Sequence, residues 1–61
     1  MTLYSIFRDD GRYITFLGDF RGFADCIDTF HNHLKEETQS DVMYEVIRCS
    51  DQKQMAMRRT M

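Results

Sequence analysis

Two short segments near the N-terminus have the composition of β-strands. Residues 3–8 and 12–17 are rich in aromatic and β-branched residues, which favour an extended backbone. Between them lies Asp9-Asp10-Gly11, and Asp-Gly adopts the positive φ angles of a tight type I′ turn, whose twist matches that of paired strands. The pattern therefore predicts a β-hairpin with a two-residue turn at Asp10-Gly11.

A helical pattern of apolar residues follows the hairpin. The apolar side chains recur at spacings of three and four, which places on one stripe of a helix Phe20, Phe23, Ile27, Phe30 and Leu34. Asp19 precedes this stripe and is a candidate N-cap, because its carboxylate can accept hydrogen bonds from free backbone N–H groups in the first turn. The spacing predicts one amphipathic helix that packs against the sheet.

A third strand is predicted over residues 42–49, after the polar loop at residues 38–41. The remaining residues, 51–61, are expected to form a tail or a short helix, since short isolated helices are marginal in water. The predicted fold class is therefore α+β, with a single ββαβ domain over residues 1–50 and the C-terminal segment beyond it. The simplest three-stranded antiparallel sheet has the order 2-1-3, with one helix on one face.

The alternation of side chains predicts which residues meet the helix. With a two-residue turn, residue 7 lies opposite residue 14, so that one face of the hairpin carries Leu3, Ser5, Phe7, Ile14 and Phe16. We assign this face to the core, together with Val42, Tyr44 and Val46 of the third strand. The alternate set of that strand contains Glu45, and a buried unpaired carboxylate is costly.

The opposite face of the predicted sheet is a candidate interaction surface. An antiparallel sheet face in water is usually polar, but this one is half apolar and collects Tyr4, Ile6, Arg8, Tyr13, Leu17, Met43 and Ile47. Contiguous exposed apolar patches commonly mark interaction sites, where tyrosine is enriched. Two other interpretations stay open: strand propensity alone places such residues on exposed faces, and the segment around Met55 and Met57 can fold back over the patch.

Length and charge narrow the possible partners. The chain has 61 residues, so it is one domain at most, and a domain of this size often gains stability from a disulfide, a metal or a second subunit. Residues 1–50 hold five basic and nine acidic side chains, a net of −4, whereas residues 51–61 hold three basic and one acidic, a net of +2. The acidic body repels phosphate backbones, so nucleic acid is not an expected partner.

The residues with catalytic or ligand chemistry do not form a recognisable set. His31 and His33 point about 200° apart on a helix and cannot share a metal there. Adjacent Asp9 and Asp10 are explained by turn chemistry. No phosphate-binding glycine motif occurs. We therefore expect no catalytic site, no metal and no cofactor.

A cytoplasmic location is expected. No apolar run approaches the ~20 residues of a membrane span, so no membrane association is predicted. The N-terminal residues 1–4 lack the basic segment and long apolar core of a signal peptide. In that compartment Cys26 and Cys49 are expected to be reduced thiols.

These observations predict a small non-enzymatic protein-binding module. We expect an inhibitor or adaptor that acts as a homodimer, the commonest form of self-association. The small size also suggests a phage-encoded antagonist of a host factor. One alternative is an oligomer that binds a small molecule or nucleotide near Arg8, Arg12, Arg21 or Arg48, because the forked donors of arginine suit planar anions. Another is a nucleic-acid binder that uses the basic tail.

Overall fold

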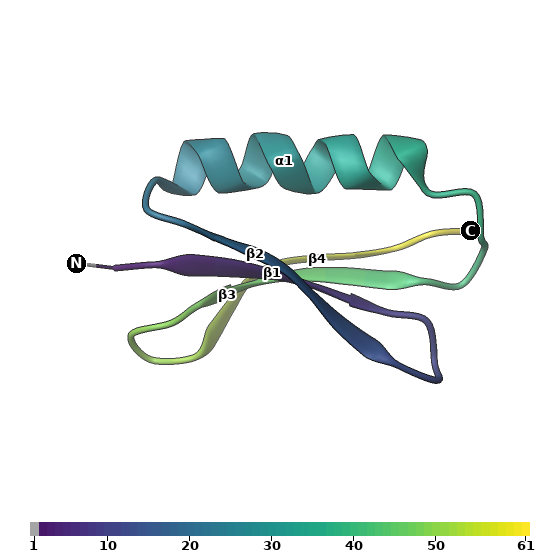
Figure 1. Cartoon of the computed structure of the whole chain (residues 1–61), viewed down its shortest axis with the longest axis horizontal. Coiled ribbons are helices and arrows are strands. Elements are labelled where there is room, and N and C mark those ends of the chain that lie inside the picture. The colour runs from purple at the N-terminus through teal and green to yellow at the C-terminus, as the bar shows by residue number, and fades with distance from the viewer. Residues whose placement is uncertain (1) are drawn as a thin grey trace.

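A computed structural model describes residues 2–61 and shows one helix lying along one side of an antiparallel sheet (Figure 1). The elements in chain order are β1 (Tyr4–Asp9), β2 (Ile14–Phe20), α1 (Phe23–Glu36), β3 (Met43–Arg48) and β4 (Lys53–Arg59). The four strands have the order β2-β1-β3-β4 across the sheet, and every neighbouring pair is antiparallel. The α+β fold class and the predicted order of the first three strands are confirmed.

The C-terminal segment is a strand, so the predicted tail or short helix over residues 51–61 is wrong and the sheet has four strands instead of three. β4 pairs with β3 from Met43 opposite Arg59 to Arg48 opposite Lys53. A short isolated helix is marginal in water, whereas a strand on the edge of β3 satisfies the backbone groups that β3 would otherwise leave unpaired. The tight return after β3 places Gln52 at a φ of 57°.

The hairpin loop is two residues longer than predicted. Asp9 lies opposite Ile14 and Phe7 lies opposite Phe16, so residues 10–13 form the connection. The Asp10 carboxylate accepts hydrogen bonds from two backbone N–H groups within this loop, each at 2.9 Å. Because two extra residues preserve the alternation of side chains, the predicted grouping of Phe7 with Phe16 on one face survives.

The helix covers the side of the hairpin that was predicted to be exposed. Val46 faces the helix, as the sequence indicates, and the register of β1 on β3 sets Ile6 directly opposite Val46. Directly opposite residues share a face of the sheet. Ile6 is consequently fully buried, and the Tyr4 ring packs on Phe23 of α1 with 5.2 Å between centroids. The predicted exposed-face position is therefore wrong for Tyr4, Ile6, Arg8 and Leu17.

A β-bulge in β2 explains why Phe20 as well as Leu17 lies on the helix side. Ile6 lies opposite Gly18 while the next residue, Phe7, lies opposite Phe16, so β2 holds one extra residue at this point. Gly18 adopts a φ of 136°, a backbone angle that residues other than glycine rarely adopt. Leu17 packs against the core by ordinary alternation with Phe16, and the bulge reverses the alternation after it, so that Phe20 packs against the core as well.

The helix begins later than predicted. Phe20 and Asp19 belong to β2, and α1 starts at Phe23 with Gly22 as the N-cap residue and no side-chain cap bond. The predicted Asp19 cap is therefore wrong, because the strand continues through that residue. The remaining helical stripe packs as expected, with Phe30 buried and with Ile27 and Leu34 against the core.

The core lies between α1 and the central strands β1 and β3. Its buried members are Ile6, Cys26, Phe30, Val42, Tyr44 and Val46. Full burial of an aliphatic or aromatic side chain contributes about 1.5–3 kcal/mol each. With so few buried side chains, individual hydrogen bonds at the margins of the sheet weigh heavily in the stability of the fold.

Thr60 ties the end of the chain to the start of β3. Its backbone N–H donates to the Val42 carbonyl at 2.9 Å, and its carbonyl accepts from the Asp41 N–H at 2.9 Å. The Thr60 hydroxyl accepts from the Val42 N–H at 3.0 Å and donates to the Gln39 carbonyl at 2.9 Å. Val42 is only 1% exposed, so its N–H has little access to water as a replacement.

We expect Thr60→Val to lower the free energy of unfolding by about 1–3 kcal/mol, because it leaves the buried Val42 N–H without a partner. Thr60→Ser keeps the hydroxyl and is expected to stay much closer to the wild type. Urea denaturation followed by circular dichroism measures both variants. Equal stability of the valine variant and the wild type would show that this bond does not hold β4 in place.

Candidate functional site

The side of the sheet opposite α1 carries most of the exposed apolar surface, and we call it the open face. The residues placed on it by the strand registers are Ser5, Phe7, Asp9, Ile14, Phe16, Asp19, Met43, Glu45, Ile47, Gln54, Met57 and Arg59. Ile14, Phe16 and Met57 are all more than half exposed, at 69%, 55% and 51%. The apolar side chains of this face that are more than half exposed therefore come from the two edge strands, β2 and β4.

The registers arrange these side chains in three rows across the sheet. The middle row is Phe16, Phe7, Glu45 and Met57. The row nearer the hairpin loop is Ile14, Asp9, Met43 and Arg59, and the row at the other end is Asp19, Ser5, Ile47 and Gln54. In the middle row the rings of Phe7 and Phe16 lie 5.7 Å apart and are tilted by 53°. This pair forms the aromatic centre of the open face, with Glu45 beside it.

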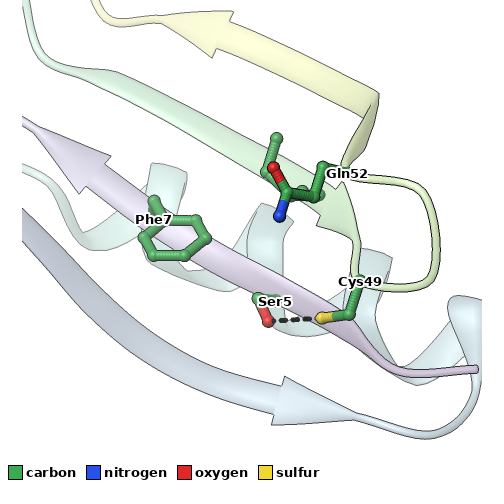
Figure 2. A pocket seen from close by; sticks show the side chains of 5 residues that line it. Ser5, Phe7, Cys49 and Gln52 are labelled. Atoms are coloured by element: carbon green, nitrogen blue, oxygen red, sulfur yellow. Dashed lines mark hydrogen bonds between the residues drawn. The ribbon is translucent and has the colours of Figure 1, made fainter.

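A hollow of about 450 Å³ lies on the open face where the end of β3 turns toward β4 (Figure 2). Phe7 and Ile47 supply its apolar lining, and Ser5, Cys49 and Gln52 supply polar groups. Figure 2 shows the Cys49 thiol pointing toward the Ser5 hydroxyl, at 3.0 Å. The lining contains neither a basic nor an acidic side chain, so the hollow is suited to an apolar group and not to an anion.

Ser5 links Asp19 and Cys49 in a chain of hydrogen bonds at this hollow. The Ser5 hydroxyl donates its single hydrogen to Asp19 Oδ1 at 2.5 Å. The hydroxyl oxygen is then the acceptor for the S–H group of Cys49. A nucleophilic cysteine needs an electropositive setting, and the hydrogen-bonded neighbours of this thiol, Ser5 and through it Asp19, carry no positive charge.

The two histidines lie apart from the open face and from each other. His31 is exposed with its ring against Phe30, 5.5 Å between centroids. His33 stacks on Tyr44 at 6.1 Å on the helix side of the sheet. Across residues 2–61 no group of three or more His, Cys, Asp or Glu side chains is arranged to hold a metal ion. In the same residues, no helix has both the length and the apolar character needed to cross a membrane.

Arg8 lies under the end of the helix in a hydrogen-bonded network. Its Nε donates to Glu37 Oε1 at 2.7 Å, and its Nη2 donates to Gln39 Oε1 at 2.9 Å. The Tyr44 hydroxyl donates to the same Glu37 oxygen. The bonds from Arg8 and Tyr44 lower the pKa of Glu37 to about 2, and the bond to Glu37 raises the pKa of Arg8. These hydrogen bonds attach the C-terminal end of α1 to the sheet.

The four arginines named as alternative positions for an anionic ligand lie in different parts of the structure. Arg8 is committed to Glu37, and Arg48 forms two bonds to the carboxylate of Asp51, at 2.6 and 3.0 Å. The pKa of Asp51 is lowered to about 2 by this pair. Arg12 lies in the hairpin loop and Arg21 in the connection after β2, both exposed. These four arginines therefore do not lie together in one site.

The predicted interface residues divide between the two faces. Met43 and Ile47 lie on the open face, and Tyr13 is 72% exposed in the hairpin loop beside Ile14. The other four lie on the helix side, as described above. The open-face residues that the sequence did not identify are Phe7, Ile14, Phe16 and Met57. Identifying them requires the register of β1 on β3, because this register decides which side chains of β1 share a face with which side chains of β3.

Comparisons with protein-family models, with curated proteins and with solved structures found no match for this chain. The functional argument therefore depends on the geometry and chemistry of the open face.

Acid should weaken the fold through Glu37. Its pKa in the folded state, about 2, lies below its ordinary value of 4.5, so its contribution to stability is present above pH 4.5 and is lost as the pH falls toward 2. We expect Glu37→Gln to be less stable at neutral pH and to lose less stability over that range. Glu36→Gln, its exposed neighbour on the helix, should keep the wild-type profile. Urea titrations at several pH values measure this, and a profile for Glu37→Gln that matches the wild type would contradict the network.

The two thiols should differ in their reaction with a thiol-specific reagent. Cys49 is exposed, whereas Cys26 is fully buried, and burial raises the pKa of the Cys26 thiol. We expect the native protein to release one equivalent of chromophore with Ellman's reagent and a second equivalent only after denaturation. Cys49→Ser should abolish the native reaction. Two rapidly reacting thiols in the native protein would contradict the buried position of Cys26.

Proposed function

We propose that this chain is a small non-enzymatic protein-binding module that engages a partner through the open face. The supporting observation is the group of apolar side chains on this face, with Ile14, Phe16 and Met57 each more than half exposed on the edge strands and with Phe7, Met43 and Ile47 on the central strands. Large contiguous apolar patches on a small protein typically mark interaction sites. Such a module acts by occupying its partner's surface, as an inhibitor or an adaptor does.

The edges of the sheet are less suited to recognition than its open face. Exposed strand edges invite pairing with other chains, and proteins commonly protect them with bulges and charged residues. The β4 edge carries a register shift together with Lys53, Arg58 and Arg59. The β2 edge carries the bulge next to Gly18. Both edges are protected in this way, and the apolar middle row of the open face is not.

The positions of the polar groups support a binding role over catalysis. Ser5 is hydrogen-bonded to Asp19 and to Cys49, and no basic side chain takes part in these bonds. Glu37 and Arg8, the pair with the largest shifts in pKa, hold the helix to the sheet away from the open face. These groups serve the architecture, and the open face offers shape and apolar area.

Replacing the exposed apolar residues should abolish binding and spare the fold. We expect Ile14→Ser and Phe16→Ser to weaken the affinity for the partner by about tenfold or more, since a few apolar anchors dominate most interfaces. Met61→Ser removes an even more exposed apolar side chain outside the open face and should change nothing. The partner is captured from the native cell with the wild-type chain, purified, and titrated against each variant by isothermal calorimetry.

Urea denaturation and light scattering accompany each titration. Wild-type stability of the serine variants shows that any lost binding comes from the face. Light scattering reports whether the captured partner is a second copy of the chain. Unchanged affinity of both serine variants would rule out the open face as the binding surface.

A further inference from the structure

The open face carries three carboxylates among its apolar residues. Asp9, Asp19 and Glu45 each accept one hydrogen bond from a neutral donor: a backbone amide at 2.8 Å, a serine hydroxyl at 2.5 Å and a glutamine amide at 2.7 Å. Within residues 2–61 none of the three has a basic group within 4.0 Å. The arginine of this face, Arg59, is paired with Asp41 at 3.1 Å. The face is therefore apolar and negatively charged at the same time.

Glu45 and the aromatic pair lie next to each other in the middle row. Glu45 is directly opposite Phe7, whose ring is tilted against that of Phe16. A guanidinium group stacks on an aromatic ring and donates its forked N–H groups to a carboxylate, so one arginine can satisfy both features at once. Asp9 is the diagonal neighbour of Glu45 on the adjacent strand, about 7–8 Å away by ordinary sheet geometry. A second basic group of the same partner can reach it.

A second copy of this chain fits the open face less well. A two-fold contact brings the same patch of both copies together. Such an interface would hold six carboxylates, three from each copy, while the arginine of this face, Arg59, is already paired with Asp41. Juxtaposed like charges disfavour such a pairing. A partner with positive charge and apolar side chains meets neither penalty.

We propose that the open face binds an arginine-bearing segment of a partner protein, with one guanidinium group over the Phe7–Phe16 pair and bonded to Glu45. This inference rests on the proposed protein-binding function and adds the chemistry of the partner. The apolar side chains of that segment cover Ile14 and Met57 on either side of the aromatic centre.

The test uses a synthetic peptide of alternating arginine and leucine, added to the full chain while amide NMR spectra are recorded. The shifted resonances are expected to come from open-face residues of β1, β2 and β3 and to saturate. The same peptide with citrulline, which is shaped like arginine but neutral, should bind about tenfold more weakly. Glu45→Gln should weaken binding of the arginine peptide about threefold or more, whereas Glu36→Gln makes the same change on the exposed helix and should have no effect.

Several outcomes overturn the inference. They are shifts confined to α1, equal affinity for the citrulline peptide, full affinity in Glu45→Gln, or a dimer through the open face that Glu45→Gln strengthens. The captured partner separates this inference from the broader function. Binding that is lost in Phe16→Ser but insensitive to Glu45→Gln keeps the protein-binding function and removes the arginine site. Binding that neither variant weakens would contradict both the binding function of the open face and the arginine site.

Discussion

The pairing of β1 with β3 determines which residues of this protein reach solvent. Val46 lies under the helix because its alternate neighbours include Glu45, and the register then places Ile6 in the core beside it. Once Ile6 points toward α1, Phe7 must point away from it, and Phe16 follows through its pairing with Phe7. One interstrand register thus buries Ile6 and exposes the side of the hairpin that carries Phe7 and Phe16.

The Arg8–Glu37 pair allows this arrangement to fold. With Ile6 in the core, the alternation of β1 also places Arg8 on the helix side, where an unpaired charge would be costly. The carboxylate of Glu37, just beyond the last residue of α1, accepts from Arg8 and from Tyr44 and neutralises that charge. The same bonds attach the end of the helix to the sheet. The bonds of Glu37 therefore compensate for placing the charged Arg8 under the helix.

Local signals were sufficient for the hairpin, for the helix over most of its length and for β3, because each depends on neighbours in the sequence. The β4 strand was missed, since Lys53–Arg59 is a strand through its pairing with β3 and has only a weak pattern of its own. The open face was missed for a related reason. Arg8 made its side of β1 look exposed, and neither the partner Glu37, twenty-nine residues away, nor the β1–β3 register is visible in a local pattern. Met43 and Ile47 were placed on the open face because β3 could be oriented by Glu45 alone.

The carboxylates of the open face have two physical consequences that act together. An apolar sheet face on a protein this small favours self-association, and negative charges placed among the apolar side chains oppose the close approach of two identical faces. The same charges lower the free energy of a complex only when the partner brings cations to Glu45, Asp9 and Asp19. Repulsion of the wrong partner and attraction of the right one are both needed for specificity. Because the apolar rows supply contact area to any partner, selectivity on this face has to come from its carboxylates.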